Sequence, residues 1–144
     1  MKKLKLNFLE SETLLPEIGI DSVLHQIGKE IREYARGYFE YIVTSTIVEN
    51  VTTDATLYII VPEIGYDYRI IHVSLYDITL VELNYFTLKS QVTESLMVNI
   101  SDGLGLENLY DSIAELLSTN LSNQTFRFLI NQVDAKRESN QKIT

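Results

Sequence analysis

The stretch YFEYIVTSTIVENVTTDATLYIIVPEIGYDYRIIHVSLYDITLVELNYFTLK, residues 38–89, decides the fold. Val, Ile, Thr, Tyr and Phe dominate it, and these residue types favour strands. Turn residues interrupt it at 51–54, 62–65 and 76–78. Each gap is too short for the crossover of a dozen or more residues that parallel strands need, so the strands should run antiparallel. We therefore predict a meander of about five strands, at residues 38–49, 56–61, 66–76, 79–89 and 96–100.

Helical spacing flanks this strand-rich region on both sides. In residues 21–36, apolar side chains recur every three or four positions and Asp21 or Ser22 offers an N-terminal cap; the apolar stripe is Leu24, Ile27, Ile31, Tyr34 and Tyr38. Residues 106–117 and 123–137 repeat the helical spacing after the strands. Residues 3–9 alternate loosely as a further strand would, and the polar residues 138–144 are expected to fray.

The predicted fold class is α+β, with one helix before an antiparallel meander and two helices after it. Helices grouped at the ends of such a sheet pack on one of its faces as a two-layer sandwich. A length of 144 residues suits one domain, which we place at residues 1–137.

Composition narrows the compartment and the chemistry. The chain has no cysteine, which excludes disulfides, thiolate metal sites and cysteine catalysis. Its N-terminal lysines begin like a signal peptide, but Asn7, Glu10 and Glu12 interrupt the apolar region that such a peptide requires. No stretch approaches the roughly 18 apolar residues of a membrane span, so we expect a cytoplasmic protein.

Charge is distributed unevenly along the chain. The net charge is −8, yet residues 38–126 hold 12 acidic and only 2 basic residues and so carry −10. Nucleic-acid binding depends on Lys and Arg, so such a region is unsuited to it. A basic protein partner would be attracted to the same region. The alternative interpretation is that the acidic charge serves only to keep the domain soluble.

Motifs for catalysis or cofactor binding are weak. His25 lies off the apolar stripe of its helix, and His72 lies in a strand with no catalytic motif around it. The glycine-containing loop at 101–105 suggests a phosphate cradle, but Asn108 occupies the place of the third glycine, and Asp102 and Glu107 would repel phosphate. We expect no cofactor and no metal ion, and we lean towards a protein that is not an enzyme.

One face of the predicted sheet remains as a candidate site. If Ile71 and Val73 face the helices, the alternate residues of each strand form a face that mixes Tyr and Thr with carboxylates. Tyrosine is enriched in binding surfaces. The candidate binding residues on this open face are Glu40, Tyr58, Tyr68, His72 and Glu82. The alternative is an ordinary solvated sheet face.

Three functions remain open. The first is a non-enzymatic protein-binding module, in its most specific form an acidic inhibitor of a basic protein, as bacterial immunity proteins are for their toxins. The second is a homodimeric chaperone or adaptor for a secreted or assembling protein. The third is a small enzyme or ligand carrier with a pocket between sheet and helix, in which His72 acts with Glu82 or Asp67.

Overall fold

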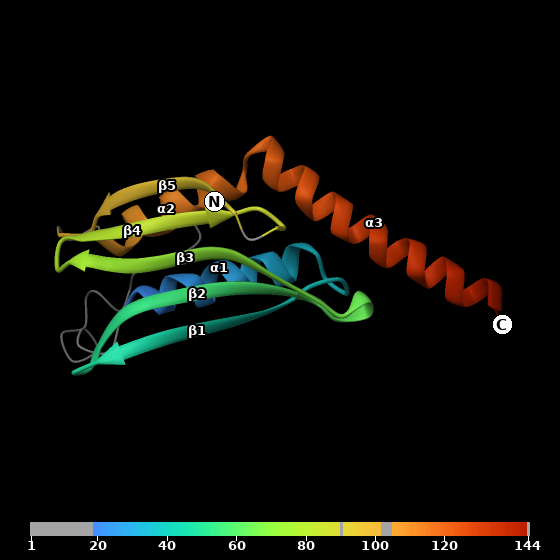
Figure 1. Cartoon of the computed structure of the whole chain (residues 1–144), viewed down its shortest axis with the longest axis horizontal. Helices are drawn as coiled ribbons and strands as arrows, with labels where there is room; N and C mark the ends of the chain where they lie inside the picture. Colours follow the sequence, from blue (N-terminus) through green and yellow to red (C-terminus); the bar gives the residue numbers. More distant parts are fainter. Residues whose placement is uncertain (1–18, 90, 102–104, 144) are drawn as a thin grey trace.

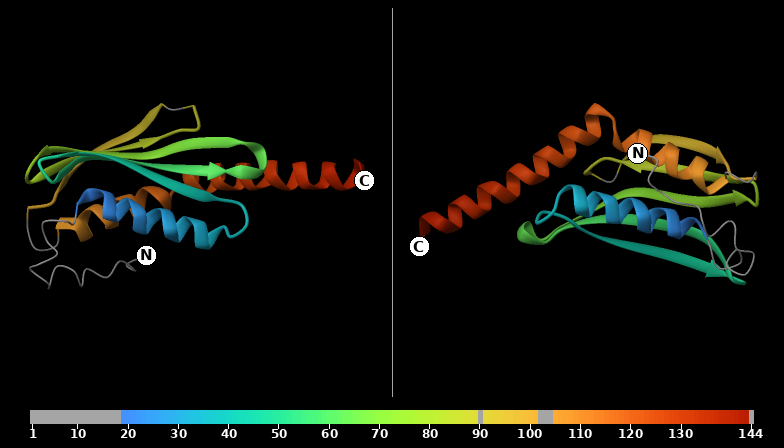
Figure 2. Two further views of the ribbon diagram at one scale, coloured as in Figure 1. Left: turned by 90° about the horizontal axis from the view of Figure 1, so that it is seen from below. Right: turned by 180° about the vertical axis from the view of Figure 1, so that it is seen from behind.

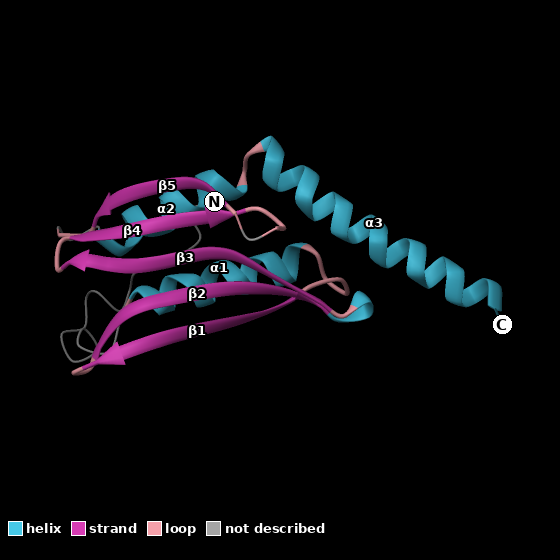
Figure 3. Cartoon of the chain, in the orientation of Figure 1, coloured by secondary structure: helices cyan, strands magenta, loops and turns pink. Residues whose placement is uncertain are grey.

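The computed structural model describes residues 19–89, 91–101 and 105–143. It confirms the predicted fold class, because one helix precedes a five-stranded antiparallel sheet and two helices follow it (Figure 3). The possible strand at 3–9 lies outside the described residues. The elements are, in order, α1 (Ile20–Tyr34), β1 (Glu40–Val48), β2 (Val51–Val61), the short 3-10 helix η3 (Pro62–Ile64), β3 (Tyr66–Asp77), β4 (Leu80–Phe86), β5 (Val92–Asn99), α2 (Gly105–Leu117) and α3 (Asn120–Ile143).

The strands lie side by side in chain order, which is the predicted meander (Figure 1). α1 and α2 lie on one side of the sheet, as the edge-on view shows, and no described helix covers its other side (Figure 2). α3 continues well past the end of the sheet. None of the helices in the described part of the chain has both the length and the apolar character that crossing a membrane requires.

Two strands begin earlier than the sequence suggested. Residues 51–54 were expected to form a turn, but β2 starts at Val51 and the turn is made by Glu49 and Asn50 alone, with φ of 51° and 66°. Positive φ at both central residues is the signature of the two-residue hairpin turn whose twist matches that of the strands. β5 likewise starts at Val92, whereas the strand was predicted from residue 96.

The core lies between the sheet and the helical layer. α1 buries Leu24, Ile27 and Ile31 in it, which confirms three residues of the predicted stripe, and it also buries Val23, which was not predicted. Tyr38 lies beyond the end of α1. Tyr34 was placed in that stripe wrongly, because its side chain is 81% exposed. The predicted caps were also wrong: α1 is capped by Gly19 without a side-chain hydrogen bond, and Asp21 accepts a hydrogen bond from Thr52 of β2 instead.

α3 starts in the helical layer and then runs along the end of the sheet. Phe126, Leu129 and Val133 are its buried residues, and Ser122 shares a buried hydrogen bond with Tyr85 of β4. The helix was expected to end near residue 137, but it continues to Ile143.

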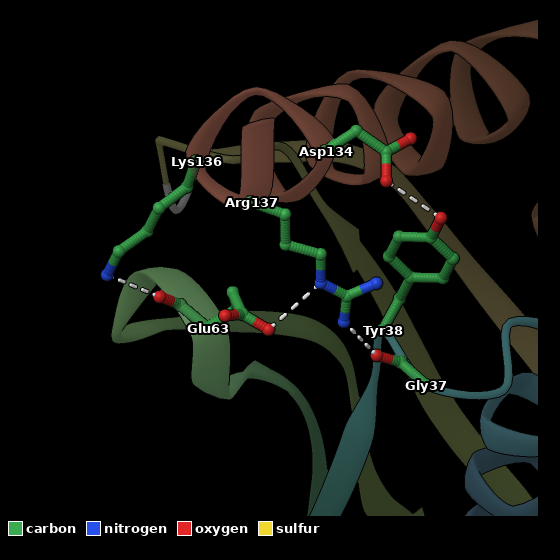
Figure 4. Close-up of polar contacts among 6 residues, drawn as sticks. All are labelled: Gly37, Tyr38, Glu63, Asp134, Lys136 and Arg137. Carbon is green, nitrogen blue, oxygen red and sulfur yellow. Dashed lines mark hydrogen bonds and ion pairs between the residues drawn. The ribbon is translucent and has the colours of Figure 1, made fainter. Parts of the chain in front are cut away.

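Polar contacts fix the middle of α3 to two turns (Figure 4). Arg137 donates hydrogen bonds to the Glu63 carboxylate at 3.1 Å and to the Gly37 carbonyl at 2.7 Å. Tyr38 donates its hydroxyl hydrogen to Asp134 at 2.8 Å, and this bond raises the pKa of the Tyr38 phenol. Exposed polar contacts of this kind contribute little to stability, so together they set the direction of the helix more than they stabilise the domain.

Gly28 allows α1 to approach β1 closely. A Cβ at this position would clash with the Tyr41 ring. We expect Gly28→Ala to lower the free energy of unfolding by about 1–3 kcal/mol through overpacking, although alanine by itself favours a helix by about 1 kcal/mol. Urea denaturation measures the change. In a Tyr41→Ala background the same substitution should stabilise; an equal loss in both backgrounds would show that the ring contact is not the cause.

Candidate protein-binding surface

The side of the sheet that faces away from the helices forms the candidate surface. Side chains alternate between the two sides of each strand. A residue whose cross-strand partner is buried therefore faces the helices, and the residues next to it along the strand face outward. We call the outer side the open sheet face; its residues are Glu40, Ile42, Thr44 and Thr46 of β1, Asp54, Thr56, Tyr58 and Ile60 of β2, Asp67, Arg69, His72 and Ser74 of β3, Glu82 and Asn84 of β4, and Ser95 and Met97 of β5.

The strand register arranges these residues in rows across the sheet. Asp54, Ser74 and Glu82 form one row, because Asp54 pairs with Ser74 and Ser74 with Glu82. At the other end of the strands, Ile60 pairs with both Glu40 and Asp67. Each row therefore carries two carboxylates, and the two acidic rows bracket the middle of the face.

The middle of the face is polar and aromatic. Thr56 pairs with His72, and His72 pairs with Asn84. In the next row Tyr58 pairs with both Ile42 and Arg69. Cross-strand pairs of this kind place their Cβ atoms about 4.5–5.5 Å apart, so these side chains form one continuous surface.

Arg69 is the one Lys or Arg among the residues of the open sheet face, and its guanidinium is held against an aromatic ring. Its Cζ atom lies 4.1 Å from the centre of the Phe86 ring. His72 lies with its Nε2 atom 4.0 Å from an Asp54 oxygen. The face thus combines four carboxylates with one guanidinium, and its electrostatic character is acidic.

The structure places four of the five predicted binding residues on this face. Glu40, Tyr58, His72 and Glu82 lie there, with His72 and Tyr58 half-buried by their neighbours and the two glutamates exposed. Tyr68 does not lie there: it pairs with the buried Ile59 and is only 2% exposed.

A β-bulge accounts for the misplacement of Tyr68. Leu57 pairs with Ile71 and Tyr58 with Arg69, so Ile70 is an extra residue in β3. An extra residue interrupts the alternation of sides along the strand. Regular alternation from His72 through Ile70 therefore predicts that Tyr68 faces outward. In the structure Asp67 faces outward instead. Sequence reasoning missed Asp67 as a face residue for this reason, and it missed Asp54, which counting from Thr56 would have found.

Tyr68 instead completes a buried polar contact. Its hydroxyl donates a hydrogen bond of 2.6 Å to the Phe86 carbonyl, inside the core. Burial, reinforced by the nearby Tyr85, raises the pKa of the Tyr68 phenol, so it stays protonated as a donor. The last cross-strand pair of β3 and β4 at this end is Ile71 with Tyr85. Tyr68 connects the two strands beyond that pair.

The main cavity lies elsewhere and has a different lining. It is an open groove of about 590 Å³ between α1 and the junction of α2 with α3, lined by Ile27, Glu30, Ile31, Glu33, Tyr34, Phe39, Leu117, Ser118, Asn123 and Phe126. His72, Asp67 and Glu82 lie on the opposite side of the sheet from this groove. This groove is therefore not the pocket of the enzyme hypothesis, in which His72 acts with Glu82 or Asp67.

The remaining carboxylates are spread over other parts of the molecule. Glu63 is paired with Arg137 of α3. Glu107, Asp111 and Glu115 recur every four residues along α2 and so share one side of that helix. Within the described ranges no three His, Cys, Asp or Glu side chains gather closely enough to hold a metal ion.

Comparison with known proteins finds no match: no family model, no curated protein and no solved structure matches the chain.

The two tyrosines of this region should respond differently to loss of the hydroxyl. Tyr68→Phe leaves the Phe86 carbonyl buried without its donor, which should lower the free energy of unfolding by about 1–3 kcal/mol. Tyr58→Phe, on the open sheet face, should change it by no more than about 0.5 kcal/mol. Thermal and urea unfolding measure both. Equal effects at the two positions would contradict the assignment of Tyr68 to the core.

Proposed function

We propose that the protein is a non-enzymatic binding module that holds a basic protein partner on its open sheet face. The observation that supports this most directly is the pair of acidic rows on the open sheet face. One row contains Asp54 and Glu82 and the other Glu40 and Asp67, and the polar and aromatic middle of the face lies between them. The described helices leave this face uncovered, so a partner can reach it (Figure 2).

The chemistry of the face suits a protein surface better than a small molecule. Small-molecule sites are concave and mostly apolar, with a few converging polar groups. The open sheet face is instead a broad array of polar and acidic side chains with Tyr58 at its middle. Acidic rows would speed the approach of a basic partner and fix its orientation, whereas Tyr58 and Ile42 would supply contact area.

An inhibitor of a basic protein, of the immunity type, is the most specific form of this proposal. It needs no catalytic group on the module, since covering the partner's basic surface is enough. An adaptor that presents the same face to a basic client is the second form. Both forms use the acidic rows in the same way, and they differ in whether one copy or two copies act together.

Charge reversal on the face tests the proposal. The double variant Glu40→Lys with Glu82→Lys removes one carboxylate from each acidic row. In capture from the native host, a basic protein should be retained by the wild type and lost with the variant. With the purified partner, calorimetry should show a dissociation constant raised by about a hundredfold, about 2.7 kcal/mol. Binding by the wild type should also weaken as salt is added.

A matched control separates this face from the charge of the whole molecule. Glu33→Lys with Glu115→Lys makes the same change of charge at exposed positions of α1 and α2, in the helical layer. The control should bind as the wild type does, and both variants should keep the wild-type melting temperature. Equal loss of binding in the two variants, or loss in the control alone, would contradict the proposal.

A further inference from the structure

The two edges of the sheet differ in a way that bears on self-association. β1 and β5 are the outermost strands, and no described strand pairs with their outer sides (Figure 1). An unpaired edge offers a row of backbone N–H and C=O groups to another strand, and proteins usually block it with charges, prolines or a covering element.

The β5 edge is blocked by charge. Glu94 lies within β5, and Asp111 and Glu115 of α2 border the strand beside Leu96 and Met97. A second copy of this acidic chain would meet carboxylates on approaching that edge. Pairing there is opposed by repulsion between like charges.

Among the described residues, the β1 edge has no such protection along most of its length. After Glu40, the residues YIVTSTIV of positions 41–48 contain no charge, no proline and no glycine. Apolar side chains that are at least half exposed gather on this strand and its hairpin, namely Ile42, Ile47, Val48 and Val51. A long, uncharged edge strand rich in β-branched residues is a template for pairing.

The sequence of β1 is complementary to itself in the antiparallel direction. A two-fold axis at Thr44 pairs all nine residues of the strand with those of a second copy. Glu40 then lies opposite Val48, Tyr41 opposite Ile47, and Ile42 opposite Thr46. The register therefore places no like charges opposite each other, and it joins aromatic and β-branched side chains of the kind that stabilise strand pairs.

The charges beside this edge are also complementary to those of a second copy that runs in the opposite direction. α1 runs antiparallel to β1, and a basic side chain borders the start of the strand: Arg32 contacts both Glu40 and the Tyr41 ring. Acidic groups border the end of the strand, where Glu49 lies in the hairpin turn and Asp21 bonds Thr52. An antiparallel copy brings the basic end of one edge beside the acidic end of the other.

We propose that two copies of the chain pair through their β1 edges as a two-fold homodimer, which joins the two sheets into one of ten strands. The inference does not depend on the proposed partner, because it rests on the unpaired backbone of β1, although Glu40, Ile42, Thr44 and Thr46 of this strand also belong to the open sheet face. A strand pair of this length is a small interface, so the dissociation constant should lie in the micromolar range. A dimer would favour the adaptor form of the proposed function over an inhibitor that acts as a single copy.

Sedimentation equilibrium of the full chain across the micromolar range tests the dimer. Ile47, 62% exposed, can be changed with little effect on folding. Ile47→Lys would place an ammonium group opposite Tyr41 of the copy, beside the Arg32 that contacts this ring, and should weaken the dimer at least about tenfold. Ile47→Glu would place a carboxylate there and should keep the dimer. If the loss of apolar area were the only effect, the two substitutions would weaken the dimer equally.

Val92→Lys is the control, because Val92 is 54% exposed on the opposite edge strand. It should leave the dimer unchanged. Hydrogen exchange of the wild type adds a measurement without mutation, in which β1 amides should become more protected as protein concentration rises. A wild type that stays monomeric throughout, or a dimer that Val92→Lys weakens and Ile47→Lys does not, would overturn the proposal.

Discussion

A single extra residue in β3 determines which side chains reach the solvent side of the sheet. Ile70 has no cross-strand partner in β2, and the alternation of sides is interrupted there. Tyr68 consequently turns inward and bonds the Phe86 carbonyl, whereas Asp67 and Arg69 turn outward. Without the bulge, one acidic row would lose Asp67 and a phenol would take its place on the open sheet face. The buried Tyr68 and the outward Asp67 of that acidic row are two consequences of one backbone feature.

The sequence predicted the elements of the fold better than their ends. β-branched and aromatic residues indicated the five strands, and the short gaps between them required an antiparallel meander. The two-residue hairpin turn at Glu49 and Asn50 was missed because neither residue is glycine, although Asn tolerates positive φ. The length of α3 was missed because residues 138–143 are polar, and a helix that projects from the domain needs no apolar stripe.

The candidate surface could be predicted in part for the same reasons. Strict alternation correctly placed Glu40, Tyr58, His72 and Glu82 on this face. In each case no bulge lies between the residue and the buried neighbours that fix the orientation of its strand. It failed where a bulge intervened, and a bulge leaves no reliable mark when the extra residue is isoleucine, because Ile70 and Ile71 both suit a buried strand. The groove between α1 and the junction of α2 with α3 could not be predicted from the sequence either, because residues from distant parts of the chain line it.

The distribution of charge connects the face to the edge. Carboxylates occupy the open sheet face and one side of α2, and they border β5, so an acidic copy that approaches one of these surfaces is repelled. The β1 edge differs from them: its strand is uncharged after Glu40, Arg32 borders its start, and Glu49 lies in the turn at its end. Pairing there would align the outer faces of two copies in one continuous sheet. Each acidic row would then recur across the two-fold axis, and a basic client with extended or repeated positive charge would meet twice the complementary surface without any new contact residue.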